Sequence, residues 1–173
     1  MPALLGYHLL CGMGSLMARP TLAWGQVPRR SWVLIVTLAV GAIALLGTPK
    51  LGVLPVAHLE HLRLQWPGGL AGHAVYVLLV NVPLEEAFWR ATLAQRYTGW
   101  SSLRHGAAFG LHHALGAGLA LGWVWALPAF LVTTLAGAYW VHGARREGGL
   151  GTALMTHGMA DLGLLALAAS QLP

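Results

Sequence analysis

The chain has 173 residues, of which 57% are hydrophobic and 9% are charged, and its formal net charge is +5. Because about a quarter of the residues in a soluble domain are charged, this composition indicates an integral membrane protein and argues against a soluble fold. The arginines stand between apolar runs rather than in one basic stretch, so we interpret them as topology signals and expect no nucleic-acid partner.

Apolar runs along the chain predict an all-α, polytopic membrane protein, a bundle of about six transmembrane helices in a single domain, residues 1–173. Most runs approach the roughly 20 residues with which a helix crosses a bilayer, and they do not alternate in polarity as barrel strands do. The predicted spans are 3–18, 31–48, 70–91, 102–118, 121–141 and 150–170.

The first span begins without the basic residues of a signal peptide, so we expect it to be retained. It holds Cys11, the only cysteine, for which we predict a buried packing role; a single cysteine also excludes an internal disulfide and a Cys-x-x-Cys metal site. The connector 49–69 is the longest in the chain, and we expect an interfacial helix in it.

Basic residues are distributed unevenly between alternate connectors. One set holds Arg19, Arg29, Arg30, Arg96, Arg104, Arg145 and Arg146, and the other holds Lys50 and Arg63. By the positive-inside rule the first set should lie in the cytoplasm, which places both termini outside.

Several ionisable residues lie inside predicted spans, where they are costly and commonly pair with one another or mark function. They include three of the five acids of the chain. The set is Glu85, Glu86 and Arg90 in the third span, His112 and His113 in the fourth, and His157 and Asp161 in the sixth.

Helical spacing separates the two adjacent glutamates. Glu86 and Arg90 are four residues apart and share a helix face, so we interpret them as a structural ion pair. Glu85 projects about 100° away from Glu86 and is therefore available for another partner, or for solvation at the cytoplasmic end of the helix.

Helical spacing also predicts which residues lie beside each histidine. His157 and Asp161 are four residues apart and can act together, or can form a hydrogen bond that joins helices. Phe109 precedes His113 by one turn and can pack against it. His112 points away from His113, which favours a packing role for His112.

The depths of these residues allow them to meet. At about 1.5 Å per residue, Glu85 lies about 9 Å from the cytoplasmic end of its span, His157 about 10 Å, and His113 and Asp161 about 16 Å. A carboxylate, two imidazoles and an aspartate at one level in the cytoplasmic half are typical of a hydrolytic centre.

Three short motifs carry these residues. EEAFWR fits EExxxR, FGLHH fits FxxxH, and HGMAD fits HxxxD/N. In this order the motifs resemble those of the CAAX protease and bacteriocin-processing family of intramembrane endopeptidases, also called the Abi family. The resemblance covers about residues 70–170.

The resemblance implies an intramembrane endopeptidase that hydrolyses a peptide bond near the C-terminus or leader of a membrane-associated protein or peptide, lipid-modified or not. In a bacterial inner membrane, a small member of this kind would suit the processing of C-terminal sorting tails. Glu85 would match the general base and His113 the residue that holds the water. His157 and Asp161 would lie near the oxyanion or a metal.

Two alternatives remain open at this stage. The favoured mechanism needs no cofactor, whereas a Zn²⁺ mechanism would use His113, His157 and Asp161 as ligands; an ionised Asp161, where the family often has Asn, cannot donate a hydrogen bond. The alternative function is a non-enzymatic membrane protein, either a bacteriocin self-immunity factor or a transporter-like subunit.

Overall fold

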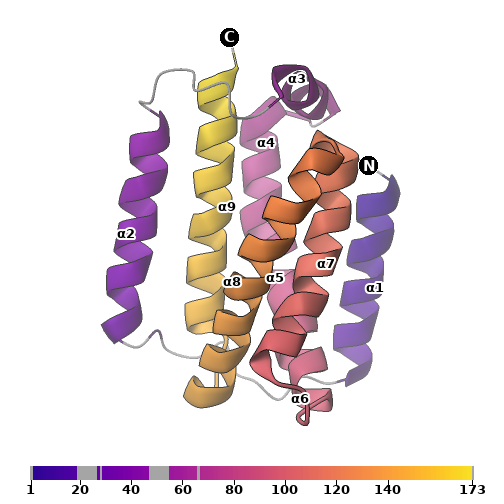
Figure 1. Ribbon diagram of the computed structural model, residues 1–173, viewed down its shortest axis with the longest axis vertical. Helices are drawn as coiled ribbons and strands as arrows, with labels where there is room; N and C mark the ends of the chain where they lie inside the picture. Colours follow the sequence, from indigo (N-terminus) through magenta and orange to yellow (C-terminus); the bar gives the residue numbers. More distant parts are fainter. Residues whose placement is uncertain (1, 19–26, 28, 47–54, 66, 173) are drawn as a thin grey trace. The chain divides into compact units, whose positions relative to one another are not determined.

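The computed structural model describes residues 2–18, 27, 29–46, 55–65 and 67–172 (Figure 1). Within these ranges the chain is helical and has no strand, which confirms the all-α prediction. The elements are α1 (Pro2–Ala18), α2 (Arg29–Leu46), α3 (Val56–Gln65), α4 (Gly69–Tyr76), η1 (Val77–Asn81), α5 (Val82–Glu86), η2 (Ala87–Leu93), α6 (Ala94–Arg96), α7 (Ser102–Leu121), η3 (Trp123–Trp125), α8 (Ala126–Glu147) and α9 (Gly151–Gln171).

A helix lies at each of the six predicted spans. The third prediction, 70–91, corresponds to the unbroken run of helical turns from α4 to α6, and the fifth corresponds to η3 and α8. Among the described residues, two stretches are long and apolar enough to cross a membrane, Trp123–Glu147 and Gly151–Gln171. A bundle of six spans therefore stays a prediction.

The connector 49–69 contains the helix α3, as expected, although its place at a membrane interface stays a prediction. Cys11 is buried, which agrees with the packing role predicted for it. Arg19 and Lys50, which contribute to the predicted orientation, lie outside the described residues.

The chain divides into two compact units. Unit 1 comprises Met1–Gln26 and Leu84–Ala153, and unit 2 comprises Val27–Pro83 and Leu154–Pro173. The single domain expected from the sequence stays a prediction.

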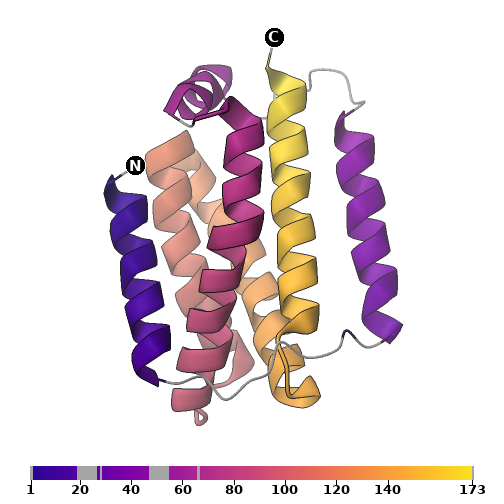
Figure 2. The same ribbon diagram turned by 180° about the vertical axis from the view of Figure 1, so that it is seen from behind.

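In unit 1, α7 and α8 pack side by side over most of their length (Figures 1 and 2). Glycines permit this close approach: a Cβ on Gly106 would lie 2.3 Å from the Thr134 carbonyl oxygen, and one on Gly110 would lie 2.1 Å from Thr134 Oγ1. Small residues have the same use where membrane helices meet. The positive φ of Gly122, 101°, ends α7 and lets the chain turn back.

The core of unit 1 is aromatic. Phe109 of α7, Trp140 of α8 and Ala153 are buried together, and Trp89 of η2 packs against them. On the other side, α1 packs against η2, where Phe88 approaches Gly14. The core therefore fixes α7, α8 and η2 relative to one another, and α7 and η2 carry three of the predicted site residues, Phe109, His113 and Arg90.

In unit 2, Gly68 and Gly69 both have positive φ and form the turn from α3 into α4. Seen from either side, α9 stands between α2 and α4 (Figures 1 and 2). Gly158 of α9 faces Leu78 of η1, because a Cβ at this glycine would lie 3.4 Å from the leucine side chain.

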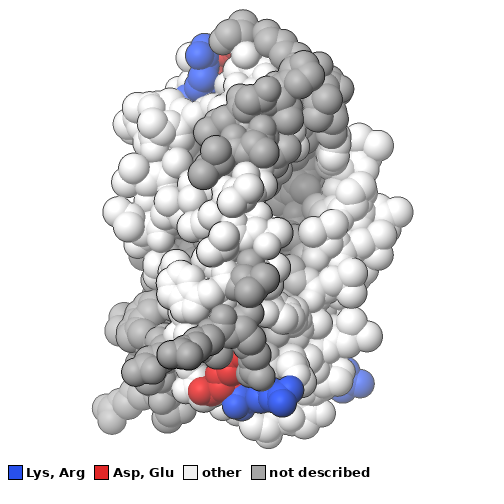
Figure 3. Space-filling model, turned by 90° about the vertical axis from the view of Figure 1, so that its left-hand side faces the viewer, with Lys and Arg blue, Asp and Glu red and all other residues white. Residues whose placement is uncertain are grey.

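The described surface is largely uncharged on the face shown in Figure 3, where acidic and basic side chains appear only in small groups. Large apolar side chains are exposed along α7 and α8, including Leu111, Leu119, Leu127 and Leu135, whereas Glu85, Glu86 and Arg90 are buried. An apolar exterior around buried charges is the distribution expected where lipid surrounds a protein.

Candidate functional site

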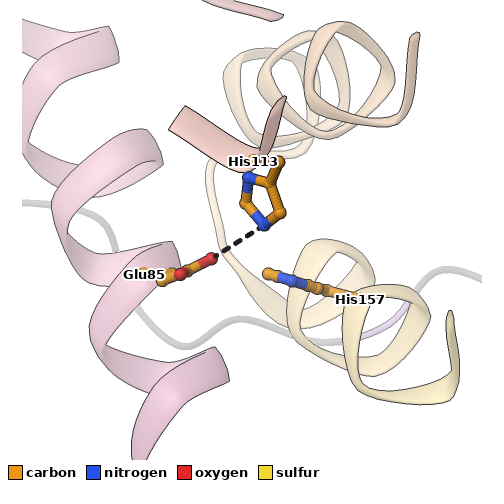
Figure 4. Close-up of side chains that lie close together, drawn as sticks. All are labelled: Glu85, His113 and His157. Atoms are coloured by element: carbon orange, nitrogen blue, oxygen red, sulfur yellow. Dashed lines mark ion pairs between the residues drawn. The ribbon is translucent and has the colours of Figure 1, made fainter. Parts of the chain in front are cut away.

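Glu85 lies in α5, a short α-helical stretch between the two π-helical stretches η1 and η2. Its side chain is only 4% exposed, and its Oε2 atom lies 3.8 Å from His113 Nε2 (Figure 4). Both residues belong to unit 1. The structure thus brings together two of the residues that the sequence assigned to the catalytic centre.

His113 is oriented by its own helix. Its Nδ1 lies 3.0 Å from the Phe109 carbonyl oxygen, and its ring lies 4.2 Å from the Phe109 ring between centroids. Because a carbonyl can only accept a hydrogen bond, this contact assigns the proton to Nδ1. In the neutral imidazole Nε2 is then an acceptor, and it is the atom directed at Glu85.

Glu86 and Arg90 form the predicted ion pair, with Arg90 Nε 3.3 Å from Glu86 Oε2 and both side chains fully buried. The Arg90 guanidinium also lies over two rings, with its Cζ 4.1 Å from the centroid of Phe109 and 4.9 Å from that of Trp140. These contacts compensate for burial of the charge. They also connect η2 to α7 and α8.

His112 makes a contact that sequence reasoning missed. Its ring stacks on Tyr7 of α1, with centroids 4.1 Å apart and planes inclined by 20°, which agrees with the packing role assigned to it. Its Nε2, however, also lies 3.9 Å from Glu85 Oε1. The only sequence signal was the presence of two adjacent histidines in one predicted span.

His157 and Asp161 form a second pair, in α9 of unit 2. His157 Nε2 lies 3.6 Å from Asp161 Oδ2, and the side chains are 3% and 28% exposed. The expected partnership of these residues, four apart on one helix, is therefore present. His157 is also labelled in Figure 4; that the two pairs serve one centre stays a prediction.

The chain matches the model of a known protein family. The family described as type II CAAX prenyl endopeptidase Rce1-like matches residues 67–163, a stretch that contains all three motifs and more than half of the chain. The chain belongs to this family. No curated protein and no solved structure matches it.

Membership in the Rce1-like family confirms the resemblance seen in the motifs. It associates the chain with membrane-embedded CAAX proteases, which act on membrane-associated proteins. Tyr7 and the rest of α1 lie outside the matched residues. The contacts between Tyr7 and His112 are therefore a feature of this chain that the family match does not describe.

Proposed function

We propose that the chain is an intramembrane endopeptidase in which Glu85 activates water with the help of His113. The observation that carries the proposal is a buried carboxylate that faces His113 Nε2, while the other nitrogen of that ring is held by a carbonyl. We further propose that His157 and Asp161 complete the centre, in the cytoplasmic half of a six-span protein of the bacterial inner membrane.

The separation of Glu85 Oε2 and His113 Nε2 suits one shared water molecule. At 3.8 Å the two atoms are too far apart for a direct hydrogen bond. Both can accept a hydrogen bond of about 2.8 Å from the same water oxygen. A water held in this way has both hydrogens engaged and a lone pair free to attack a carbonyl carbon.

The proposed reaction then conserves protons. The water oxygen bonds to the carbonyl carbon while its proton passes to Glu85, and the carbonyl oxygen becomes an oxyanion. An imidazolium at His157 has an N–H on both nitrogens, so it can face Asp161 with one and the oxyanion with the other. When the C–N bond breaks, Glu85 returns the proton to the leaving nitrogen, which yields a carboxylic acid and an amine.

The residues also suit a zinc ion. A metal-bound histidine typically has its second nitrogen held by a carbonyl or carboxylate, and His113 has this arrangement through Phe109. Glu85, His113 and His157, rather than the Asp161 expected from the sequence, would hold Zn²⁺, which when bound would lower the pKa of a coordinated water. We favour the cofactor-free mechanism, in which Glu85, buried and facing His113 Nε2, is the general base.

The first test is hydrolysis of defined peptides by the purified chain in liposomes. The probes are a quenched fluorescent peptide that ends in a farnesylated CAAX sequence, the same peptide without the lipid, and a membrane-anchored protein with a C-terminal sorting tail. Cleavage of the last probe would support the processing role that we propose for this chain.

The decisive variant is Glu85→Gln, which keeps the shape of the side chain but removes the base. We expect kcat to fall by about 10²- to 10⁴-fold, with folded yield unchanged. Glu60→Gln is the matched control, since Glu60 pairs with Arg63 near the surface of α3. Wild-type turnover by Glu85→Gln would contradict the proposal.

Metal dependence is tested separately by exhaustive chelation of the purified protein, with bound zinc measured by mass spectrometry. We expect turnover to survive, because proton transfer to Glu85 requires no metal. Loss of activity that returns on addition of Zn²⁺ would instead establish the metal-dependent mechanism.

A further inference from the structure

We propose that His112 is a positioning residue that fixes the orientation of the Glu85 carboxylate, and that Tyr7 of α1 holds His112 in place. The inference rests on the proposed function, because it concerns the orientation of Glu85 as the general base. It adds two residues, and a helix outside the family match, to the proposed centre.

The first observation is that two imidazoles contact different oxygens of one carboxylate. His112 Nε2 lies 3.9 Å from Oε1, and His113 Nε2 lies 3.8 Å from Oε2. The two rings are perpendicular, with centroids 5.2 Å apart. Because each oxygen has its own imidazole, rotation of the carboxylate would disturb both contacts, and Oε2 is kept directed at His113.

The second observation is that Tyr7 restricts the His112 ring. The two rings stack at 4.1 Å between centroids, and the Tyr7 hydroxyl accepts a hydrogen bond of 3.0 Å from Trp89 Nε1. The position of Tyr7 is therefore fixed by a residue of η2. Stacking limits the tilt of the histidine ring and so limits where its Nε2 can point.

Together these contacts form a ring that begins and ends on the helical run that carries Glu85. Glu85 contacts His112, His112 stacks on Tyr7, Tyr7 accepts from Trp89, and Trp89 lies one turn after Glu85 on the same run of helix. Trp89 also packs edge-on against Phe109, whose carbonyl holds His113. A shift of α1 would therefore move His112 and change the orientation of the Glu85 carboxylate.

The competing explanation is that Tyr7 and His112 only pack together. The two explanations differ in what the nitrogen of His112 does. His112→Phe keeps an aromatic ring on Tyr7 but removes the contact to Glu85, so packing alone predicts normal turnover. The proposed positioning role predicts a loss of kcat of about 10- to 100-fold, as expected for a misaligned catalytic group, with KM within about twofold of the wild type.

A double-mutant cycle tests whether Tyr7 acts through His112. Tyr7→Leu should lower kcat by a similar factor, and Tyr7→Phe, which keeps the stacked ring, should restore most of it. In the His112→Phe background, Tyr7→Leu should cause no further loss, because the contact it supports is already absent. Tyr97→Leu is the matched control, since Tyr97 stacks on Trp100 in the same unit.

A spectroscopic measurement on the same proteins needs no substrate. In protein labelled with ¹⁵N-histidine, the ring signals of His112 should shift on Glu85→Gln and on Tyr7→Leu, and should be unchanged by Tyr97→Leu. Unshifted His112 signals, normal turnover by His112→Phe, or additive losses in the cycle would each overturn the inference while leaving the proposed function intact. A wild-type protein that hydrolyses none of the probes would overturn both.

Discussion

Glu85 and Glu86 are neighbours in the sequence with different surroundings. Glu86 is fully buried against Arg90, which also contacts Phe109 and Trp140. Glu85 is directed at two imidazoles that are partly exposed. The first environment is that of a structural charge, and the second is that of a group that can exchange protons with a bound molecule.

This contrast predicts opposite effects from the same chemical change. Glu86→Gln removes the ion-pair partner of the buried Arg90, and loss of one partner of a buried pair typically costs about 3–5 kcal/mol. We therefore expect a lower folded yield and a lower Tm in thermal unfolding in detergent, with substantial turnover per folded molecule. A stable Glu86→Gln protein beside an unstable Glu85→Gln protein would mean that the two roles are reversed.

The sequence predicted contacts between residues of one helix better than contacts between helices. Glu86 with Arg90, and His157 with Asp161, follow from a spacing of four residues, and both pairs are present. The second contact of His112 was missed because it depends on Tyr7, far away in the sequence, and on the direction of the Glu85 side chain. No local pattern contains that information.

At the scale of elements, the run from α4 to α6 was predicted as one span without its π-helical stretches. Hydropathy locates a helix but carries no signal for a change from i→i−4 to i→i−5 hydrogen bonding. π-helical turns occur frequently at functional sites, and here they flank the five residues that contain both glutamates.

The pairing of α7 with α8 predicts different outcomes for two glycines of one helix. A Cβ on Gly106 would meet the Thr134 carbonyl oxygen at 2.3 Å and the Ala138 nitrogen at 2.7 Å, whereas one on Gly116 would meet no other packed element of the described chain within 4 Å. Gly106→Ala should therefore force the helices apart and destabilise the protein by about 1–3 kcal/mol.

Gly116→Ala is the control, and it should be neutral or stabilising by up to about 1 kcal/mol, because alanine favours helix. Thermal unfolding of both variants measures the difference. Since α7 also carries His112 and His113, Gly106→Ala should lower turnover as well. Equal stability of the two variants would show that α7 and α8 pack less closely than described.

At the scale of the whole molecule, composition and hydropathy predicted the places of the helices well. Six apolar runs coincide with helices because backbone groups in an apolar environment must be satisfied within the chain. Within the part of the chain that the structure describes, two of these helices are long and apolar enough to be recognised as spans, α8 with η3 and α9. The run that contains Glu85, Glu86 and Arg90 and the helix that contains His112 and His113 are not among these two. Both hold polar groups on which the proposed function depends, and α9 holds two more, His157 and Asp161.

The predicted orientation can be tested on the helix that carries Glu85. Positive-inside counting places the connector between α6 and α7 in the cytoplasm and α3 outside. Cys11 is the only cysteine, so Cys11→Ser provides a background without thiols. Leu64 of α3 is 77% exposed, and a Cβ on Gly99 in the other connector would have open space on the side of the described residues; each can therefore be replaced by cysteine.

A membrane-impermeant maleimide distinguishes the two sides. In intact cells or spheroplasts, Leu64→Cys should be labelled at once, and Gly99→Cys should be labelled only after permeabilisation. The reverse pattern would invert the protein and move the proposed centre to the outer half of the membrane. Labelling of both cysteines from one side would mean that the helical run between them does not cross, and the six-span prediction would then be wrong.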